Sequence, residues 1–133
     1  MTKIESEKLS INNSAENIFT FLSNFNNFEK LMPEQIINWQ ATEDTCSFTI
    51  KGMTDIGMRI KEKIPNSKIV IVPDGKVSFG FELLCLLEET AADKTNTQIV
   101  FNADLNPMLK MMAAKPLQNF VNLLVQKLKE LFD

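Results

Sequence analysis

The C-terminal stretch from Asn106 to about Leu131 constrains the fold of this 133-residue chain more than any other segment. Asn106 can cap a helix, and Pro107 suits the first helical position, where its missing N–H costs nothing. Pro116 lies within the stretch and predicts a kink or a division of the helix near 113–115. Apolar residues recur at helical spacing and form one stripe. The stripe consists of Leu117, Phe120, Val121, Leu124, Leu128 and Leu131.

The segment between Pro33 and Asn106 alternates apolar and polar residues, as half-buried strands do. One strand carries on a single face Val77, Phe79, Phe81, Leu83, Cys85 and Leu87, with Ser78 on the other. Other strands carry on one face Ile37, Trp39 and Ala41; Cys46, Phe48 and Ile50; Ile56, Met58 and Ile60; and Ile99, Phe101, Ala103 and Leu105. Short turns such as Asp74-Gly75 join them, which favours an antiparallel meander. Its apolar face needs a cover, and only the C-terminal helix is large enough.

The N-terminal segment adds a strand and two short helices. Lys3 to Ile11 is typical of a short charged strand, and Asn13 or Ser14 can cap a first helix. A second helix is expected from Asn27 to Met32. We therefore expect residues 1–133 to form one α+β domain. It would contain a curved antiparallel sheet of six to seven strands, two short N-terminal helices, and a long C-terminal helix packed across the concave face.

Two N-terminal segments carry a resemblance to a known family: Ile11 to Phe19, at the entry into the first helix, and Phe21 to Pro33, which follows it. They are similar to the first-helix entry and the following helix pair of the START and polyketide-cyclase-like (SRPBCC) superfamily. The fold of this superfamily is the helix grip, and the major birch pollen allergen is a member. The element order agrees over essentially the whole chain. The resemblance implies a cavity between sheet and helix for a hydrophobic molecule such as a lipid, sterol, polyketide or quinone. Phe28 to Pro33 also resembles the quinone-binding branch.

With this fold, a ligand would contact the inward faces of sheet and helix. We expect the ligand-binding residues to be Trp39, Phe48, Met58, Phe79, Phe81, Phe101, Met108, Met111, Met112, Leu117, Phe120 and Leu124. Methionine side chains are flexible and polarizable. The three methionines of the helix, with Met58 on a facing strand, could form a deformable pocket mouth. Ordinary core filling beside a helix kink is the alternative.

The usual catalytic residues are scarce in this chain, which has no His and no Tyr. It also has neither a nucleophile elbow nor a phosphate-binding glycine loop. We therefore expect no catalytic residues, no metal and no cofactor. Cys46 and Cys85 lie in strand-like apolar stretches and are interpreted as reduced core thiols, with a disulfide as the alternative.

The charge pattern limits the partners. A net charge of −3 and a pI of about 5.0 argue against nucleic-acid binding. Arg59, Lys61 and Lys63 are expected on the outward face of one strand, with Lys51 beside them. They form either a solvated face that discourages edge pairing or a dock for an acidic partner or an anionic lipid head group. With no signal peptide and no membrane span, we expect a cytoplasmic protein.

The sequence is compatible with three functions. The first is binding or transport of a small hydrophobic ligand, which predicts an apolar cavity between helix and sheet. The second is a polyketide cyclase or aromatase, which needs a polar group facing that cavity. The third is a protein-interaction or chaperone-cofactor domain, which predicts an exposed apolar patch. The protein is expected to be a monomer or a homodimer.

Overall fold

The computed structural model describes residues 1–75, 77 and 79–133. Its helices are α1 (Ala15–Leu22), the 3-10 helix η1 (Phe25–Leu31) and α2 (Pro107–Phe132). Its strands are β1 (Thr2–Glu5), β2 (Leu9–Ile11), β3 (Ile36–Ala41), β4 (Thr45–Ile50), β5 (Thr54–Ile64), β6 (Lys68–Pro73), β7 (Phe81–Ala91) and β8 (Lys94–Ala103).

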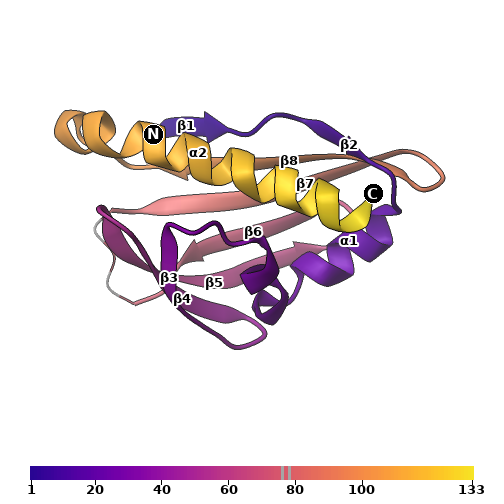
Figure 1. The fold of residues 1–133 in the computed structure, drawn as a ribbon, viewed down its shortest axis with the longest axis horizontal. Coiled ribbons are helices and arrows are strands. Elements are labelled where there is room, and N and C mark those ends of the chain that lie inside the picture. The colour runs from indigo at the N-terminus through magenta and orange to yellow at the C-terminus, as the bar shows by residue number, and fades with distance from the viewer. Residues whose placement is uncertain (76, 78) are drawn as a thin grey trace.

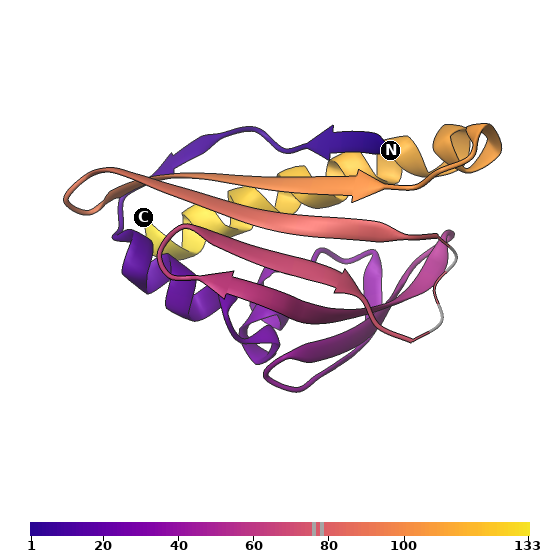
Figure 2. The ribbon, with the colours of Figure 1, turned by 180° about the vertical axis from the view of Figure 1, so that it is seen from behind.

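The strands form one antiparallel sheet in the order β1-β8-β7-β6-β5-β4-β3, and β2 also pairs with β8. Figure 1 shows α2 lying along one face of this sheet, with α1 and η1 on the same side. Figure 2, the view from behind, shows strands in front and α2 behind them. The expected α+β architecture, an antiparallel sheet that wraps a long C-terminal helix, is confirmed.

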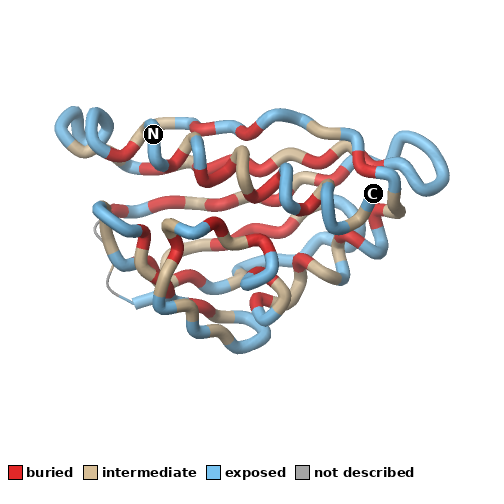
Figure 3. Tube along the Cα trace, viewed as in Figure 1, coloured by how far each residue is buried: buried red, intermediate tan, exposed pale blue. Residues whose placement is uncertain are grey.

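One apolar side of α2 packs into the core. Its buried residues are Ala113, Leu117, Phe120, Val121, Leu124, Val125 and Leu128. The helix contacts β8, β1, β2 and η1. Figure 3 shows the buried residues concentrated along the strands and the inner side of this helix. Each large apolar side chain contributes about 1.5–3 kcal/mol when fully buried, so this stripe holds α2 against the sheet.

The expected N-terminal strand from Lys3 to Ile11 is divided in two. Residues 6–8 separate β1 from β2, and Ser6 keeps this interruption bonded to β8. The backbone N–H of Ser6 donates to the Ile99 carbonyl oxygen at 2.8 Å, and the Ile99 N–H donates to Ser6 Oγ at 2.9 Å. Because both halves pair with β8, the sheet contains eight strands, one more than the upper expected number.

The two N-terminal helices differ in type. Ser14 caps α1, where its Oγ accepts from the Asn17 N–H at 3.1 Å. The second helix is a 3-10 helix, η1, and begins earlier than expected, since Asn24 caps it by accepting from the Asn26 N–H at 2.9 Å. The two short helical segments are therefore present, but only the first is an α-helix and the second spans Phe25–Leu31 instead of 27–32.

Of the two effects expected of Pro116, a kink or a division of the helix, the division is wrong and the kink stays a prediction. Helix α2 continues from Pro107 to Phe132 with Pro116 inside it. Proline removes the N–H that would bond the carbonyl of Met112. Met112 is exposed, so water can satisfy that carbonyl. The break in hydrogen bonding therefore falls on the solvent side of the helix.

A bulge in β5 changes which face its basic residues occupy. The register shifts between Ile60 and Glu62, so that Lys63 lies opposite Ile69, which is fully buried. The Lys63 Nζ pairs with Asp44 Oδ1 at 3.1 Å. Arg59 precedes the bulge and lies opposite Val72. The expectation that Arg59, Lys61 and Lys63 share one outward face was wrong, because a bulge reverses strand alternation.

Two further strands depart slightly from simple alternation. In β3 the register shifts between Ile37 and Gln40, and Asn38 has a φ of 57°. As a result Ile36 is buried and Ile37 is only partly buried. The strand expected from Val77 begins as β7 at Phe81, although Phe79 is already buried. The outward position expected for Ser78 lies outside the described residues.

Candidate ligand-binding site

Aromatic side chains form two groups in the core, and one of them includes a residue of α2. In the first group Trp39 stacks on Phe48 with ring centroids 5.4 Å apart, and Phe48 stacks on Phe120 of α2 at 6.1 Å. In the second group Phe81 stacks on Phe101 at 5.0 Å, and Phe79 contacts both rings. These groups give the interior a polarizable apolar lining.

Eight of the twelve expected ligand-binding residues are buried in one apolar core. They are Phe48, Met58, Phe79, Phe81, Phe101, Leu117, Phe120 and Leu124. Trp39 is partly buried and packs against the same core. The sequence pattern therefore identified residues that the fold does bring together, although their contact with a ligand stays a prediction.

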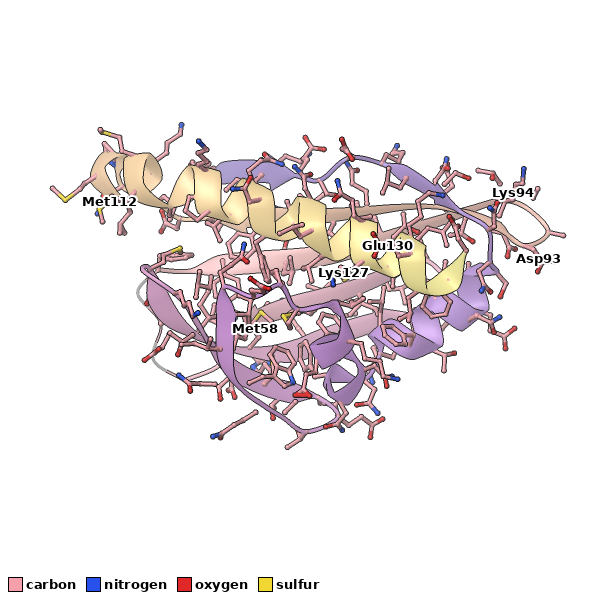
Figure 4. The ribbon with its side chains drawn as sticks, in the orientation of Figure 1. Met58, Asp93, Lys94, Met112, Lys127 and Glu130 are labelled. Carbon is pink, nitrogen blue, oxygen red and sulfur yellow. The ribbon has the colours of Figure 1, made fainter. Side chains whose placement is uncertain are left out.

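The three methionines of α2 lie elsewhere. Met108, Met111 and Met112 are 72%, 87% and 66% exposed, whereas Met58 is 1% exposed. Figure 4 shows Met112 at the free end of α2 and Met58 within the molecule, far from it. The structure thus does not unite Met58 with the helix methionines in one pocket mouth. We name residues 107–116 the α2 tip.

A small notch opens beside the α2 tip. It has a volume of about 120 Å³ and is lined by Lys51, Gly52, Met53, Thr54, Phe79, Leu109, Met112, Ala113 and Pro116. Residues 51–53 form the turn between β4 and β5, and Thr54 begins β5, so the notch lies between this turn region and the helix. Phe79 belongs to the notch and also to the second aromatic group. The notch therefore connects the surface with the buried aromatic side chains.

Polar contacts hold α2 unevenly along its length. From Gln118 onward, its side chains and C-terminus bond the segment 5–13. The Gln118 amide donates to the Glu5 carbonyl oxygen at 2.7 Å, and Lys129 Nζ donates to the Ser10 carbonyl oxygen at 2.8 Å. Asp133 Oδ1 accepts from the Asn12 N–H at 2.9 Å. Among the described residues, no side chain of the α2 tip makes such a bond.

The interior holds few polar groups. The buried polar side chains of the described residues belong to Ser6, Thr95 and Thr97. The Thr97 hydroxyl lies on the inner face between Leu9 and Leu87 and has no hydrogen-bond partner among the described residues. The interior of the described structure is therefore apolar apart from these hydroxyls and two thiols.

Both cysteines are free and buried. Burial raises the pKa of the Cys85 thiol to about 12, and it does the same for Cys46 despite a hydrogen bond with the Met58 backbone. Both thiols are therefore protonated at neutral pH and are poor nucleophiles and poor metal ligands. No group of metal-ligating side chains occurs among the described residues.

Sequence reasoning missed two features of this site. Met53 and Leu109 line the notch, but the first lies in a turn and the second between exposed residues, so no periodic signal marked them. Thr97 could have been found. Counting back by twos from Ile99 places Thr97 and Thr95 on the inner face of β8.

Comparison with solved structures places this architecture among known folds. A START superfamily protein from Mycobacterium smegmatis is 16% identical with a TM-score of 0.71, over 98% of this chain and 96% of that one. Norcoclaurine synthase from Thalictrum flavum, in complex with dopamine and hydroxybenzaldehyde, is 12% identical with a TM-score of 0.75, over 98% and 85%. The chain has the START-like helix-grip fold.

A third similar structure with the helix-grip fold is the di-domain ARO/CYC BexL from the BE-7585A biosynthetic pathway. It is 15% identical with a TM-score of 0.71, over 98% of this chain and 46% of that one. No family model and no curated protein matches the sequence. Among the described residues, no helix is long and apolar enough to cross a membrane. At these identities the likeness defines the helix-grip fold and leaves the function to the site.

Proposed function

We propose that this helix-grip protein binds and carries a small hydrophobic molecule between α2 and the sheet. The observation that carries the proposal is the notch beside the α2 tip. Its lining is largely apolar, and Phe79 links it to the buried aromatic residues Phe81 and Phe101. An apolar molecule entering here would leave water for a lining of aromatic rings and thioethers, which is favourable in proportion to the area buried.

The size of the notch determines how binding must occur. Sites for drug-sized ligands typically measure roughly 300–1,000 Å³, whereas the notch measures about 120 Å³. Binding therefore requires the α2 tip to move away from residues 51–54 on the other side of the notch. The polar contacts are consistent with such a movement. Among the described residues, hydrogen bonds to segment 5–13 attach the helix from Gln118 onward and leave out the α2 tip.

A carrier fits the described interior better than a cyclase or aromatase. Such an enzyme needs an acid, a base or a polarising group beside its substrate. The inner face of the described residues supplies threonine hydroxyls and thiols whose pKa is raised to about 12. Retaining an apolar molecule needs no titratable group.

The only tryptophan provides a built-in reporter for this proposal. Trp39 stacks on Phe48, which stacks on Phe120 of α2. Titration with 1-anilinonaphthalene-8-sulfonate should change Trp39 emission while the fluorescence of the bound dye rises. Added palmitate should displace the dye.

Two adjacent alanines give a matched pair of variants. Ala113 lines the notch and is buried, whereas Ala114 is the next residue and is not part of the lining. Ala113→Leu should fill the notch and weaken dye binding about tenfold, the effect of losing contact with about two methylenes. Ala114→Leu should leave dye affinity nearly unchanged. Equal effects of the two variants, or no change in Trp39 emission on titration, would refute the proposal.

A further inference from the structure

The α2 tip exposes more apolar surface than a helix end needs. Met108, Met111 and Met112 follow at spacings of three and one, so they lie around adjoining turns. All three are largely exposed. Figures 1 and 2 show that these turns extend past the strands at this end of the molecule. The methionines therefore form a projecting apolar surface rather than a patch on a flat face.

Positive charge surrounds these methionines. The exposed Lys110 and Lys115 lie on the same turns, and Lys51 lies across the notch. Neither helix lysine forms an ion pair among the described residues. No acidic residue occurs between Asp104 and Glu130, although the chain as a whole has a net charge of −3. The α2 tip therefore differs in charge from the rest of the protein.

The helix end itself adds to this positive field. The N-terminus of a helix carries a partial positive charge from its free N–H groups. Asn106 Oδ1 accepts from the Leu109 N–H at 2.9 Å and caps one of them. The helix N-terminus lies at the projecting end of α2 (Figure 1), so its partial positive charge is at the α2 tip.

Apolar residues flanked by lysines at a projecting tip match the interface of an anionic bilayer. Head groups attract the lysines, and the acyl boundary accepts the methionines. A protein partner would need a complementary groove to bury a convex tip, whereas a bilayer deforms around it. Flexible thioether side chains suit a surface without fixed shape.

We propose that the α2 tip docks the protein onto anionic lipid membranes, inserting Met108, Met111 and Met112 between head groups that Lys51, Lys110 and Lys115 contact. Docking would place the notch at the membrane surface, so that an apolar molecule passes between bilayer and protein without crossing water. The transfer of an apolar molecule during docking rests on the proposed carrier function. Membrane binding itself does not depend on that function and is measured without any carried ligand.

Vesicle flotation tests the proposal with the 133-residue chain. Vesicles of phosphatidylcholine alone and of phosphatidylcholine with phosphatidylserine are the probes, at low and high salt. We expect binding to the phosphatidylserine vesicles and weakening by salt, because screening reduces charge attraction. Lys110→Gln and Lys115→Gln should each lower the partition coefficient about fivefold.

The apolar contribution is tested with a triple variant, Met108→Ser, Met111→Ser and Met112→Ser. It should lower the partition coefficient at least about tenfold, since three exposed apolar side chains are removed. The matched control is Ile64→Ser with Leu131→Ser, which removes exposed apolar residues remote from the tip. This control should bind like the unchanged protein, and circular dichroism should show that all variants are folded.

Two results would overturn the proposal. One is the absence of binding to phosphatidylserine vesicles. If light scattering then shows a dimer that the triple variant dissociates, the methionines contact a second copy of the chain instead. The other is vesicle binding that the triple variant leaves unchanged. Met112 also lines the notch, so the carrier function is assessed by dye binding to the unchanged protein and to the two lysine variants, whose residues 110 and 115 lie outside the lining. Dye binding without vesicle binding, or the reverse, then distinguishes failure of one property from failure of the other.

Discussion

The side-chain amide of Gln118 donates to the main-chain oxygen of Glu5 at 2.7 Å, and this bond marks where α2 becomes attached to the N-terminal segment. Farther along the helix, Asn122 accepts from the Glu7 N–H at 3.2 Å and Lys129 bonds the Ser10 carbonyl. The α2 tip has no equivalent among the described residues. The helix is thus bonded at one end and held only by packing at the other.

This asymmetry predicts uneven amide hydrogen exchange along one continuous helix. Local opening exposes weakly attached segments first. Amides of residues 111–115 should exchange at least about tenfold faster than those of residues 121–128, measured by exchange with mass spectrometry or NMR. Uniform protection from 111 to 128 would show that the α2 tip is as firmly held as the rest.

Gly57 predicts a large difference between two glycine substitutions. The Asp74 N–H donates to the Gly57 carbonyl oxygen at 2.9 Å, and a Cβ at position 57 would clash with the backbone oxygen of Asp74. Gly57→Ala should lower the free energy of unfolding by about 1–3 kcal/mol, the range for overpacking against a fixed group. Urea denaturation measures this.

Gly80 is the matched control for that substitution. A Cβ at Gly80 meets no atom within 4 Å. Gly80→Ala should leave the free energy of unfolding within about 0.5 kcal/mol of the original value. If Gly57→Ala and Gly80→Ala lower the free energy of unfolding equally, the close contact between Gly57 and Asp74 does not constrain the fold.

The Thr97 hydroxyl predicts a stabilising substitution. Leaving a buried hydroxyl without a partner costs about 1–3 kcal/mol. Thr97→Val keeps the shape and removes that cost, so the free energy of unfolding should rise by about 1 kcal/mol in thermal or urea denaturation. The neighbour Thr95 donates to the Asn13 carbonyl oxygen at 2.9 Å, so Thr95→Val should instead destabilise the protein. Destabilisation by Thr97→Val would mean that its hydroxyl is satisfied.

The two thiols predict a loss of stability in alkali. Burial raises the pKa of Cys46 and Cys85 from 9.0 to about 12, so above about pH 9 the unfolded chain releases thiol protons that the native state retains. Because these protons are released on unfolding, a rise in pH lowers the free energy of unfolding. The loss is up to about 1.4 kcal/mol per pH unit for each thiol until about pH 12.

Urea midpoints measured from neutral pH upward test this alkaline loss. The double variant Cys46→Ala with Cys85→Ala provides the comparison, since it has the same lysines and, like the original, no tyrosine. Its stability should fall less steeply with pH above about 9. Parallel pH profiles for the two proteins would contradict the assignment of buried, protonated thiols.

Much of the fold could be predicted from alternation and capping. Phe48, Phe81 and Phe101 lie on the buried face that their strands indicated, and Asn106 caps α2 as expected. Apolar periodicity works here because each strand has one face in the core. Apolar alternation therefore predicts which side chains point inward, and most of the expected lining residues are buried.

The remainder depends on tertiary context that local patterns do not contain. Met108, Met111 and Met112 look like core residues by composition, but α2 begins beyond the end of the sheet and leaves them uncovered. Lys63 changes face because a bulge inserts one residue into β5, and the residue types in this strand do not predict a bulge. Pro116 does not divide the helix, since its missing hydrogen bond falls beside exposed Met112.

Native mass spectrometry of the protein purified from its own host tests the carrier function most directly. A fraction of the folded protein should carry an apolar molecule of roughly a few hundred daltons, the mass of ligands that such sites hold. This fraction should shrink in Ala113→Leu and persist in Ala114→Leu. Folded protein that shows only its bare mass in every preparation, and that takes up neither dye nor palmitate, would contradict it.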